Sequence, residues 1–252
     1  MKLTFKCIVL LFYLSSYGQT NTTTTIKLSI EDSRSNKTYS WGAPDTIVIY
    51  KLPEDTIMFK IIPRLYRKFP IKLEKIPISD YKLIFKNNFK QVVIKQVRLA
   101  YQDTNIIKLY PDILLNYSQN TLSKLKEKER ISISYSSQGC FSSAHLKITI
   151  TKRYTNLVAT LSSHKWYFVN KNGKKSIKHG ADSIMQTKTL NQKNIQDFIR
   201  FENELNYTSD GGCTTTDSYA IESKYLNIKR IDGRCNWDGF YYLRKSFFGD
   251  MR

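Results

Sequence analysis

The first half of the chain carries short stretches in which apolar and polar positions alternate. Residues 26–30 read IKLSI and residues 81–85 read YKLIF, so that every second side chain is apolar. A period of two is typical of a β-strand with one buried face. Turn-forming sequences such as EDSRSNK, LPED and KNN separate these stretches. The pattern predicts an antiparallel β-sandwich or barrel over residues 24–115.

The second half begins with the same period and then changes it. Residues 130–135 (RISISY), 145–154 and 157–163 alternate, and Asn172-Gly173 is a two-residue turn signal that predicts a β-hairpin. Apolar side chains then recur at helical spacing, which predicts a helix over residues 190–205 and a short C-terminal helix. The apolar positions are Ile195, Phe198, Ile199 and Leu205 in the first helix, and Trp237, Phe240, Leu243 and Phe247 in the second.

Thr189 with Gln192 has the spacing of a capping box at the start of the first helix. Residues 116–130 are polar and charged, and we expect a linker or a short surface helix there. The fold class predicted is mainly β, with the sandwich followed by an α+β domain over residues 131–252.

One stretch of the sandwich resembles a known family. Residues 78–112, ISDYKLIFKNNFKQVVIKQVRLAYQDTNIIKLYPD, resemble the end of a carboxypeptidase-regulatory or transthyretin-like β-sandwich. The glycine-rich opening of that family is missing, and IKLSIEDSRSNKTYSW stands in its place. The resemblance implies a small structural or adhesive module without catalytic residues. The chain as a whole resembles exported proteins of Bacteroidota.

The N-terminus reads MKLTFKCIVLLFYLSSYGQT, with Lys2 and Lys6 before an apolar run and small residues after it. This order predicts a secretory signal peptide over residues 1–19. The apolar run is shorter than the roughly 20 residues that a membrane span needs, and no later stretch is apolar enough. An uncleaved anchor is the alternative. We expect a periplasmic, outer-surface or secreted protein.

The formal net charge is +19, from 40 basic and 21 acidic residues. Such an excess favours anionic partners, and export makes nucleic acid an unlikely one. We expect envelope polysaccharide, lipid head groups or another envelope protein, although scattered lysines also suit a chain from an AT-rich genome. Aromatic residues interleaved with lysine would suit sugars, but a sandwich core accounts for most of them. The densest basic patches supply the candidate anion or glycan contacts: Arg64, Arg67, Lys68, Lys171, Lys174 and Lys175.

Three cysteines remain after signal cleavage. An odd number in an exported chain predicts one disulfide and one free thiol. We expect Cys213 to pair with Cys235, with Cys140–Cys213 as the alternative. Because a disulfide needs Cα atoms within about 7 Å, the first pairing requires the chain to fold back near residues 224–227.

Cys140 and His145, five residues apart, are the one candidate catalytic pair, with Asp217 as a possible orienting carboxylate. They define the alternative function, a hydrolase or transferase, although a free or buried structural thiol is the favoured interpretation of Cys140. No paired zinc-knuckle spacing, phosphate loop or dinucleotide fingerprint occurs, so no metal or cofactor is expected. The favoured interpretation is an exported, non-catalytic binding or structural protein of the cell envelope.

Overall fold

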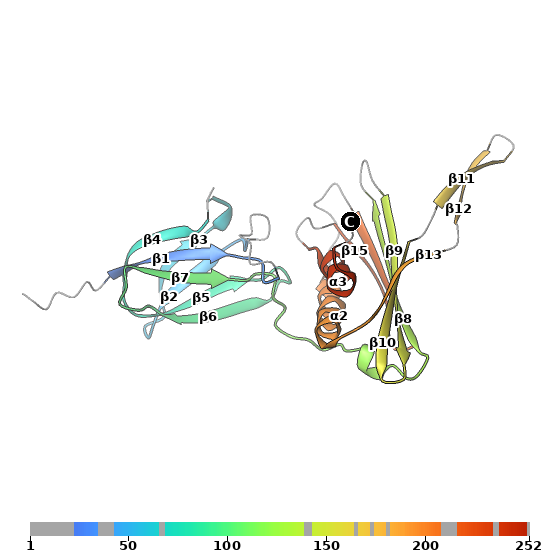
Figure 1. The fold of residues 1–252 in the computed structure, drawn as a ribbon. Helices are drawn as coiled ribbons and strands as arrows, with labels where there is room; N and C mark the ends of the chain where they lie inside the picture. Colours follow the sequence, from blue (N-terminus) through green and yellow to red (C-terminus); the bar gives the residue numbers. More distant parts are fainter. Residues whose placement is uncertain are drawn as a thin grey trace, which may run out of the picture. The chain divides into compact units, whose positions relative to one another are not determined.

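The computed structural model divides the chain into two compact units, residues 1–115 and 116–252. Figure 1 draws both, and each is described here separately. Of residues 166–171 and 174–179 the structure describes the backbone only. The described residues are 23–34, 43–65, 69–138, 143–163, 166–171, 174–179, 182–207, 216–233 and 237–250.

The first unit is a β-sandwich of two sheets, in the strand orders β4-β1-β7 and β3-β2-β5-β6. Every neighbouring pair is antiparallel except β1 with β7, which is parallel. The strands are β1 (Thr23–Ile30), β2 (Ile47–Lys51), β3 (Thr56–Ile61), β4 (Ile71–Pro77), β5 (Asp80–Lys86), β6 (Val92–Arg98) and β7 (Thr104–Leu109), with a 3₁₀ turn at Pro63–Leu65.

The alternating residues of the sequence form one core between the two sheets. Ile26 and Leu28 on β1 share a hydrophobic cluster with Ile49 on β2 and Leu83 on β5, all almost fully buried. Each such side chain contributes roughly 1.5–3 kcal/mol when it leaves water. Tyr81 is also fully buried, and its hydroxyl donates to the carbonyl of Pro77 at 2.8 Å.

One lysine protects an open side of the sandwich. β6 and β7 are edge strands of different sheets, and Lys95 on β6 pairs with the inward-facing Leu83. Its Nζ donates to the main-chain carbonyl of Lys108 on β7 at 2.7 Å. An inward-pointing charge on an edge strand disfavours pairing with a further strand. Lys95 therefore connects the two edge strands, and its charge disfavours the addition of a further strand at this edge.

The second unit is a six-stranded antiparallel sheet in the order β13-β10-β9-β8-β14-β15. Two helices, α2 (Gln192–Glu204) and α3 (Gly239–Phe248), cover one face of it (Figure 1). The predicted fold class, mainly β with two helices in the second part, is confirmed. The strands are β8 (Arg130–Gln138), β9 (Ser143–Arg153), β10 (Asn156–Ser163), β13 (Ser183–Thr189), β14 (Thr216–Glu222) and β15 (Asn227–Asp232), and a separate hairpin is formed by β11 (Trp166–Lys171) and β12 (Lys174–His179).

Two turns fall where the sequence predicts them. Lys171 pairs with Lys174 across the two-residue connection of the β11–β12 hairpin. Between β14 and β15 the N–H of Ser223 donates to the carbonyl of Leu226 at 2.8 Å. The chain therefore folds back within the segment that a Cys213–Cys235 disulfide requires.

The predicted helix cap was wrong by two residues. Thr189 belongs to β13, where it pairs with Val158, so the backbone stays extended past this position. The cap is Asn191, whose side chain accepts from the N–H of Asn194 at 2.9 Å, while the Asn194 side chain accepts from the N–H of Asn191 at 3.0 Å. Two asparagines thus form the reciprocal cap that we assigned to a threonine and a glutamine.

The segment that we expected to be a linker is anchored to α2. The Oδ1 of Asn203 accepts the N–H groups of Ser118 and Gln119, both at 2.9 Å, and its Nδ2 donates to the Gln119 carbonyl at 2.8 Å. Leu122, in a 3₁₀ turn over Leu122–Lys124, and Leu125 are buried. This part of the segment therefore packs as an element of the second unit.

Candidate functional site

The structure does not bring His145 and Asp217, two of the three candidate catalytic residues, together. His145 on β9 pairs with Ser136 of β8, whereas Asp217 on β14 pairs with the next residue, Ser137. Paired residues share a face of the sheet and consecutive residues alternate, so His145 and Asp217 lie on opposite faces. Cys140 lies outside the described residues.

Asp217 lies among aromatic side chains on the helix-covered face. Its Oδ1 is 3.4 Å from the hydroxyl of Tyr135 and its Oδ2 is 3.2 Å from that of Tyr219. Burial raises the pKa of both phenols, and the nearby carboxylate raises the pKa of Tyr219 further. Both hydroxyls therefore stay protonated and donate to Asp217. Phe240 of α3 stacks on Tyr135 of β8, with ring centroids 4.4 Å apart, so this aromatic pair packs α3 against the sheet.

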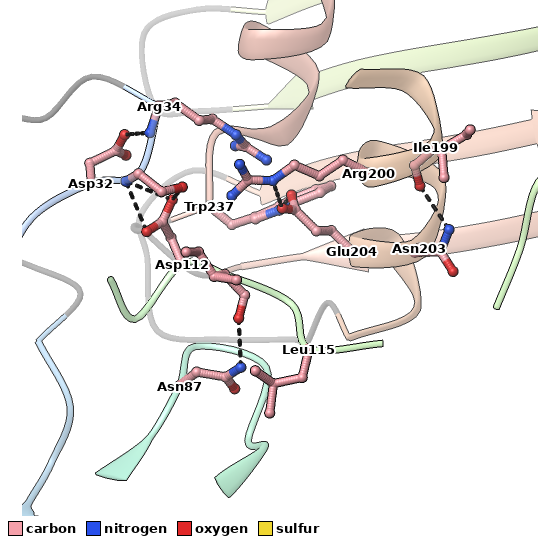
Figure 2. A network of polar contacts seen from close by, with 12 residues as sticks. Asp32, Arg34, Asn87, Asp112, Leu115, Ile199, Arg200, Asn203, Glu204 and Trp237 are labelled. Atoms are coloured by element: carbon pink, nitrogen blue, oxygen red, sulfur yellow. Dashed lines mark hydrogen bonds and ion pairs between the residues drawn. The ribbon is translucent and has the colours of Figure 1, made fainter. Parts of the chain in front are cut away.

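A buried carboxylate links α2 to the chain just before α3. Glu204 is fully buried and accepts from the Nε of Arg200 at 2.6 Å and from the indole N–H of Trp237 at 2.8 Å. Figure 2 shows the Arg200 side chain reaching this carboxylate. Phe201 stacks on the Trp237 ring, with centroids 5.8 Å apart. Because these contacts join α2 to Trp237, which lies just before the start of α3, we assign them a structural role.

Glu202 points to a different set of partners from Glu204. Its Oε2 accepts from the N–H of Thr121 at 3.1 Å, while its Oε1 is buried without a hydrogen bond. Burial raises the pKa of this carboxyl, which the contacts with Thr121 offset only in part. The two glutamates therefore do not form an acid–base pair.

The basic patches and cysteines singled out in the sequence are only partly described. The β11–β12 backbone places Lys171, Lys174 and Lys175 at the loop end of that hairpin, and Arg64 lies in the 3₁₀ turn over Pro63–Leu65. The side chains of these four residues are not described. Arg67, Lys68, Cys213 and Cys235 lie outside the described residues.

A pocket of about 580 Å³ opens at one end of the sandwich. It lies where β2 ends, β5 begins and β6 ends. Main-chain hydrogen bonds hold these segments together, from Leu52 N to the Asp80 carbonyl at 2.9 Å and from Leu99 N to the Ser79 carbonyl at 3.1 Å. The pocket is lined by Leu52, Pro53, Ile78, Ser79, Asp80, Arg98, Leu99, Ala100 and Tyr101.

The polar side of this pocket is a bidentate ion pair. The Nε and Nη2 atoms of Arg98 donate to the two oxygens of Asp80 at 2.7 and 2.8 Å. The hydrogen bond from Arg98 holds the pKa of Asp80 below its ordinary value, so the carboxylate stays charged. The Ser79 hydroxyl donates to the Leu52 carbonyl at 3.2 Å. The pair thus presents both an acceptor and a donor next to an apolar wall.

The apolar side combines aliphatic side chains with one aromatic ring. Leu52, Pro53, Ile78 and Leu99 line the wall, and Tyr101, whose residue is 79% exposed, stands at the rim. An apolar concavity with a few convergent polar groups is the usual form of a small-molecule site. We did not identify this pocket from the sequence. The available signal was the pairing of two opposite charges, Asp80 and Arg98, at matching ends of an alternating hairpin.

Comparisons with protein-family models, curated proteins and solved structures give no significant match. Within the part of the chain that the structure describes, no three His, Cys, Asp or Glu residues are grouped so that they could hold a metal ion. None of the described helices is long and apolar enough to span a membrane.

Proposed function

We propose that this chain is an exported, non-catalytic binding protein of the cell envelope and that the pocket at the end of its sandwich binds a glycan. The pocket itself is the observation that supports this function. Its volume of about 580 Å³ falls within the roughly 300–1,000 Å³ of ordinary ligand sites. A second pocket among the described residues, lined in part by Lys95, Asn105 and Lys108, has a volume of about 270 Å³ and falls below this range.

The chemistry of the pocket suits a sugar ring. A sugar has an apolar C–H face, which packs well against an aromatic ring such as that of Tyr101. Its hydroxyls both donate and accept, and Asp80 and Arg98 supply the complementary groups. The guanidinium has five N–H donors, of which Asp80 engages two, so donors remain for a hydroxyl or a carboxylate of the ligand. With a net charge of +19, the chain favours an acidic glycan over a neutral one.

Export is supported by the signal-peptide pattern of residues 1–19, which lie outside the described residues. N-terminal sequencing of protein recovered from the producing cell tests it directly. A mature N-terminus near residue 19 or 20 supports export, and an intact Met1 contradicts it. The resemblance of residues 78–112 to carboxypeptidase-regulatory sandwiches fits a binding module and also remains part of the proposal. Nothing in the placement of His145 and Asp217 favours the enzyme alternative.

The binding claim is tested by presenting the mature protein to an array of acidic and neutral polysaccharide fragments. We expect at least one acidic fragment to bind, and Arg98→Gln to weaken that binding about tenfold or more, because a hydrogen bond to a charged group contributes about 1.5–3 kcal/mol. Arg153→Gln is the matched control, since Arg153 is an exposed arginine in the second unit. An equal loss of affinity in Arg98→Gln and Arg153→Gln would mean that binding depends on net charge alone and not on the pocket.

A further inference from the structure

Three neighbouring strands of the sandwich carry apolar residues on both faces. β2 reads IVIY, β5 contains LIF and β6 contains VVI, so Val48, Ile84, Val92 and Ile94 are apolar outward positions among polar and charged ones. Strands with one face in water usually alternate, whereas continuous apolar runs are typical of a sheet covered on both faces. The inner face is covered by the other sheet of the sandwich. The apolar runs therefore indicate a covered patch within the outer face.

The strand register groups the outward apolar residues. Val48 on β2 pairs with Ile84 on β5, and Ile84 pairs with Ile94 on β6, so the three form one row across the sheet. Val92 lies two residues before Ile94 on the same face. We call Val48, Ile84, Val92 and Ile94 the outer apolar stripe. Within it Ile94 is 60% and Val92 is 54% exposed. A contiguous exposed apolar surface of this kind marks an interaction site.

Lysines flank the outer apolar stripe. Lys60 pairs with Val48 on the β3 side, and Lys86 pairs with Val92 at the other end. Both are exposed, and the structure shows no carboxylate within ion-pair distance of either among the residues that it describes. Lys82 on the same face is different, because its Nζ lies 2.7 Å from Asp55. The stripe therefore has two uncompensated positive charges beside it.

The positive charges of Lys60 and Lys86 distinguish between possible binding partners of the outer apolar stripe. A second copy stacked face to face through this stripe would bring its own Lys60 and Lys86 close to those of the first, and this repulsion disfavours it. An anionic surface has the complementary charge. An extended anionic surface can lie against Lys60 and Lys86 at the same time as the stripe, and the positive net charge of the full sequence, +19, favours such a surface in general. A single acidic protein segment would have to match both lysines and the stripe between them.

We propose that the outer apolar stripe docks on an anionic lipid bilayer, with Ile94 and Val92 entering the head-group region and Lys60 and Lys86 lying against lipid phosphates. Apolar side chains flanked by lysines are the combination that binds the membrane interface. This site lies at the opposite end of β5 and β6 from the glycan pocket, since Lys86 and Val92 are paired at one end and Asp80 and Arg98 at the other. The two proposals can therefore fail independently.

The test is co-flotation of the mature protein with vesicles of phosphatidylcholine alone or mixed with phosphatidylglycerol. We expect partitioning onto the anionic vesicles only. Ile94→Ser should reduce it about tenfold, because a partly buried aliphatic side chain is lost from the interface. The control is Ile106→Ser, because Ile106 is similarly exposed, at 66%, but lies on β7 of the other sheet. Thermal unfolding verifies that both variants remain folded.

The charge contribution is tested in the same assay. Lys86→Gln should reduce partitioning about fivefold, the effect of one lysine near an anionic surface. Lys27→Gln is its control, since Lys27 is an exposed lysine on β1 of the other sheet. If the stripe variants Ile94→Ser and Lys86→Gln lost no more partitioning than their controls Ile106→Ser and Lys27→Gln, net charge alone would drive binding and the proposal would be overturned. Failure to float with anionic vesicles would also overturn it and would leave an acidic protein surface as the occupant.

Discussion

His145 and Asp217 lie on opposite faces of the six-stranded sheet, although the strands that carry them flank the same strand, β8. Asp217 is held by two tyrosine hydroxyls on the face that the helices cover. It therefore cannot orient His145 for catalysis, so Asp217 is not the third member of a triad with Cys140 and His145.

The first prediction concerns the reactivity of Cys140. In reduced protein its alkylation by iodoacetamide should follow an ordinary thiol titration with a midpoint at about pH 8.5, because Asp217 lies on the opposite face of the sheet and does not orient His145 as a base. His145→Ala should change the rate less than twofold. Peptide-level mass spectrometry follows Cys140 separately from the other cysteines. A midpoint below about 7 that His145→Ala abolishes would restore the enzyme alternative.

A second prediction concerns the disulfide. Asp217 pairs with Asp232 at the open ends of β14 and β15. Cys213 lies three residues before Thr216, and Cys235 lies three residues after Asp232, so each is within about 11 Å of a described strand end. We predict a Cys213–Cys235 disulfide, and Cys213→Ser should then lower the free energy of unfolding by about 3 kcal/mol.

Peptide mapping without reduction distinguishes this pairing from its rival. The rival Cys140–Cys213 is also compatible with the register, because Gln138 pairs with Thr216. A cross-linked peptide that contains Cys140 would contradict our assignment.

The third prediction concerns Gly239, the first residue of α3. A Cβ atom at this position would overlap the ring of Trp237, so only glycine lets the indole pack over the helix start and reach Glu204. Gly239→Ala should lower the free energy of unfolding by about 2 kcal/mol and change the tryptophan fluorescence. Gly249→Ala is the control, since a Cβ there meets no atom and only the positive φ of 82° is strained. Unaltered fluorescence in Gly239→Ala would refute this packing role.

The fourth prediction concerns Glu202 and pH. Burial raises the pKa of Glu202 in the folded protein above the unfolded value of about 4.3, so folding favours its protonated form. The contribution of this residue to stability is therefore greatest below the unfolded pKa and is lost as the pH rises through the folded pKa. Glu202→Gln keeps an acceptor for Thr121 and removes the buried charge. It should raise the free energy of unfolding at pH 7 by about 1 kcal/mol.

Urea denaturation at several pH values measures this effect. The difference between the variant and the wild type should shrink as the pH falls toward 4. A difference that does not change with pH would show that Glu202 does not titrate in this way.

Local sequence signals predicted the individual strands and helices. They could not predict which distant strands pair with one another. Alternation identified β5, and Asn172-Gly173 marked the connection from β11 to β12, because both depend on neighbouring residues only. The parallel pairing of β1 with β7 joins residues about 80 positions apart, which no local pattern encodes. The helix cap was missed because the pairing of Thr189 with β10 overrides the local capping signal.

The pocket depends on the same long-range information. Leu52, Ser79 and Tyr101 come from three separate segments, and only the pairing of β2, β5 and β6 makes them neighbours. The basic clusters drew attention in the sequence because their charges are contiguous, whereas the pocket combines a single arginine with residues that look like ordinary core. A search for residues that are close together in the sequence therefore does not find the pocket, whose residues become neighbours only in the fold.

The central claim is that the sandwich pocket binds a glycan, and a matched pair of tyrosine variants tests it most directly. Tyr101 stands at the pocket rim, and Tyr154, which is 86% exposed, lies far along the chain in the second unit. Calorimetric titration with the acidic fragment selected on the array should show binding roughly five- to thirtyfold weaker for Tyr101→Ala, because a stacked ring contributes about 1–2 kcal/mol including its buried area. Tyr154→Ala should bind as the wild type does. Wild-type affinity in Tyr101→Ala, or no binding of any fragment by the wild type, would contradict the account.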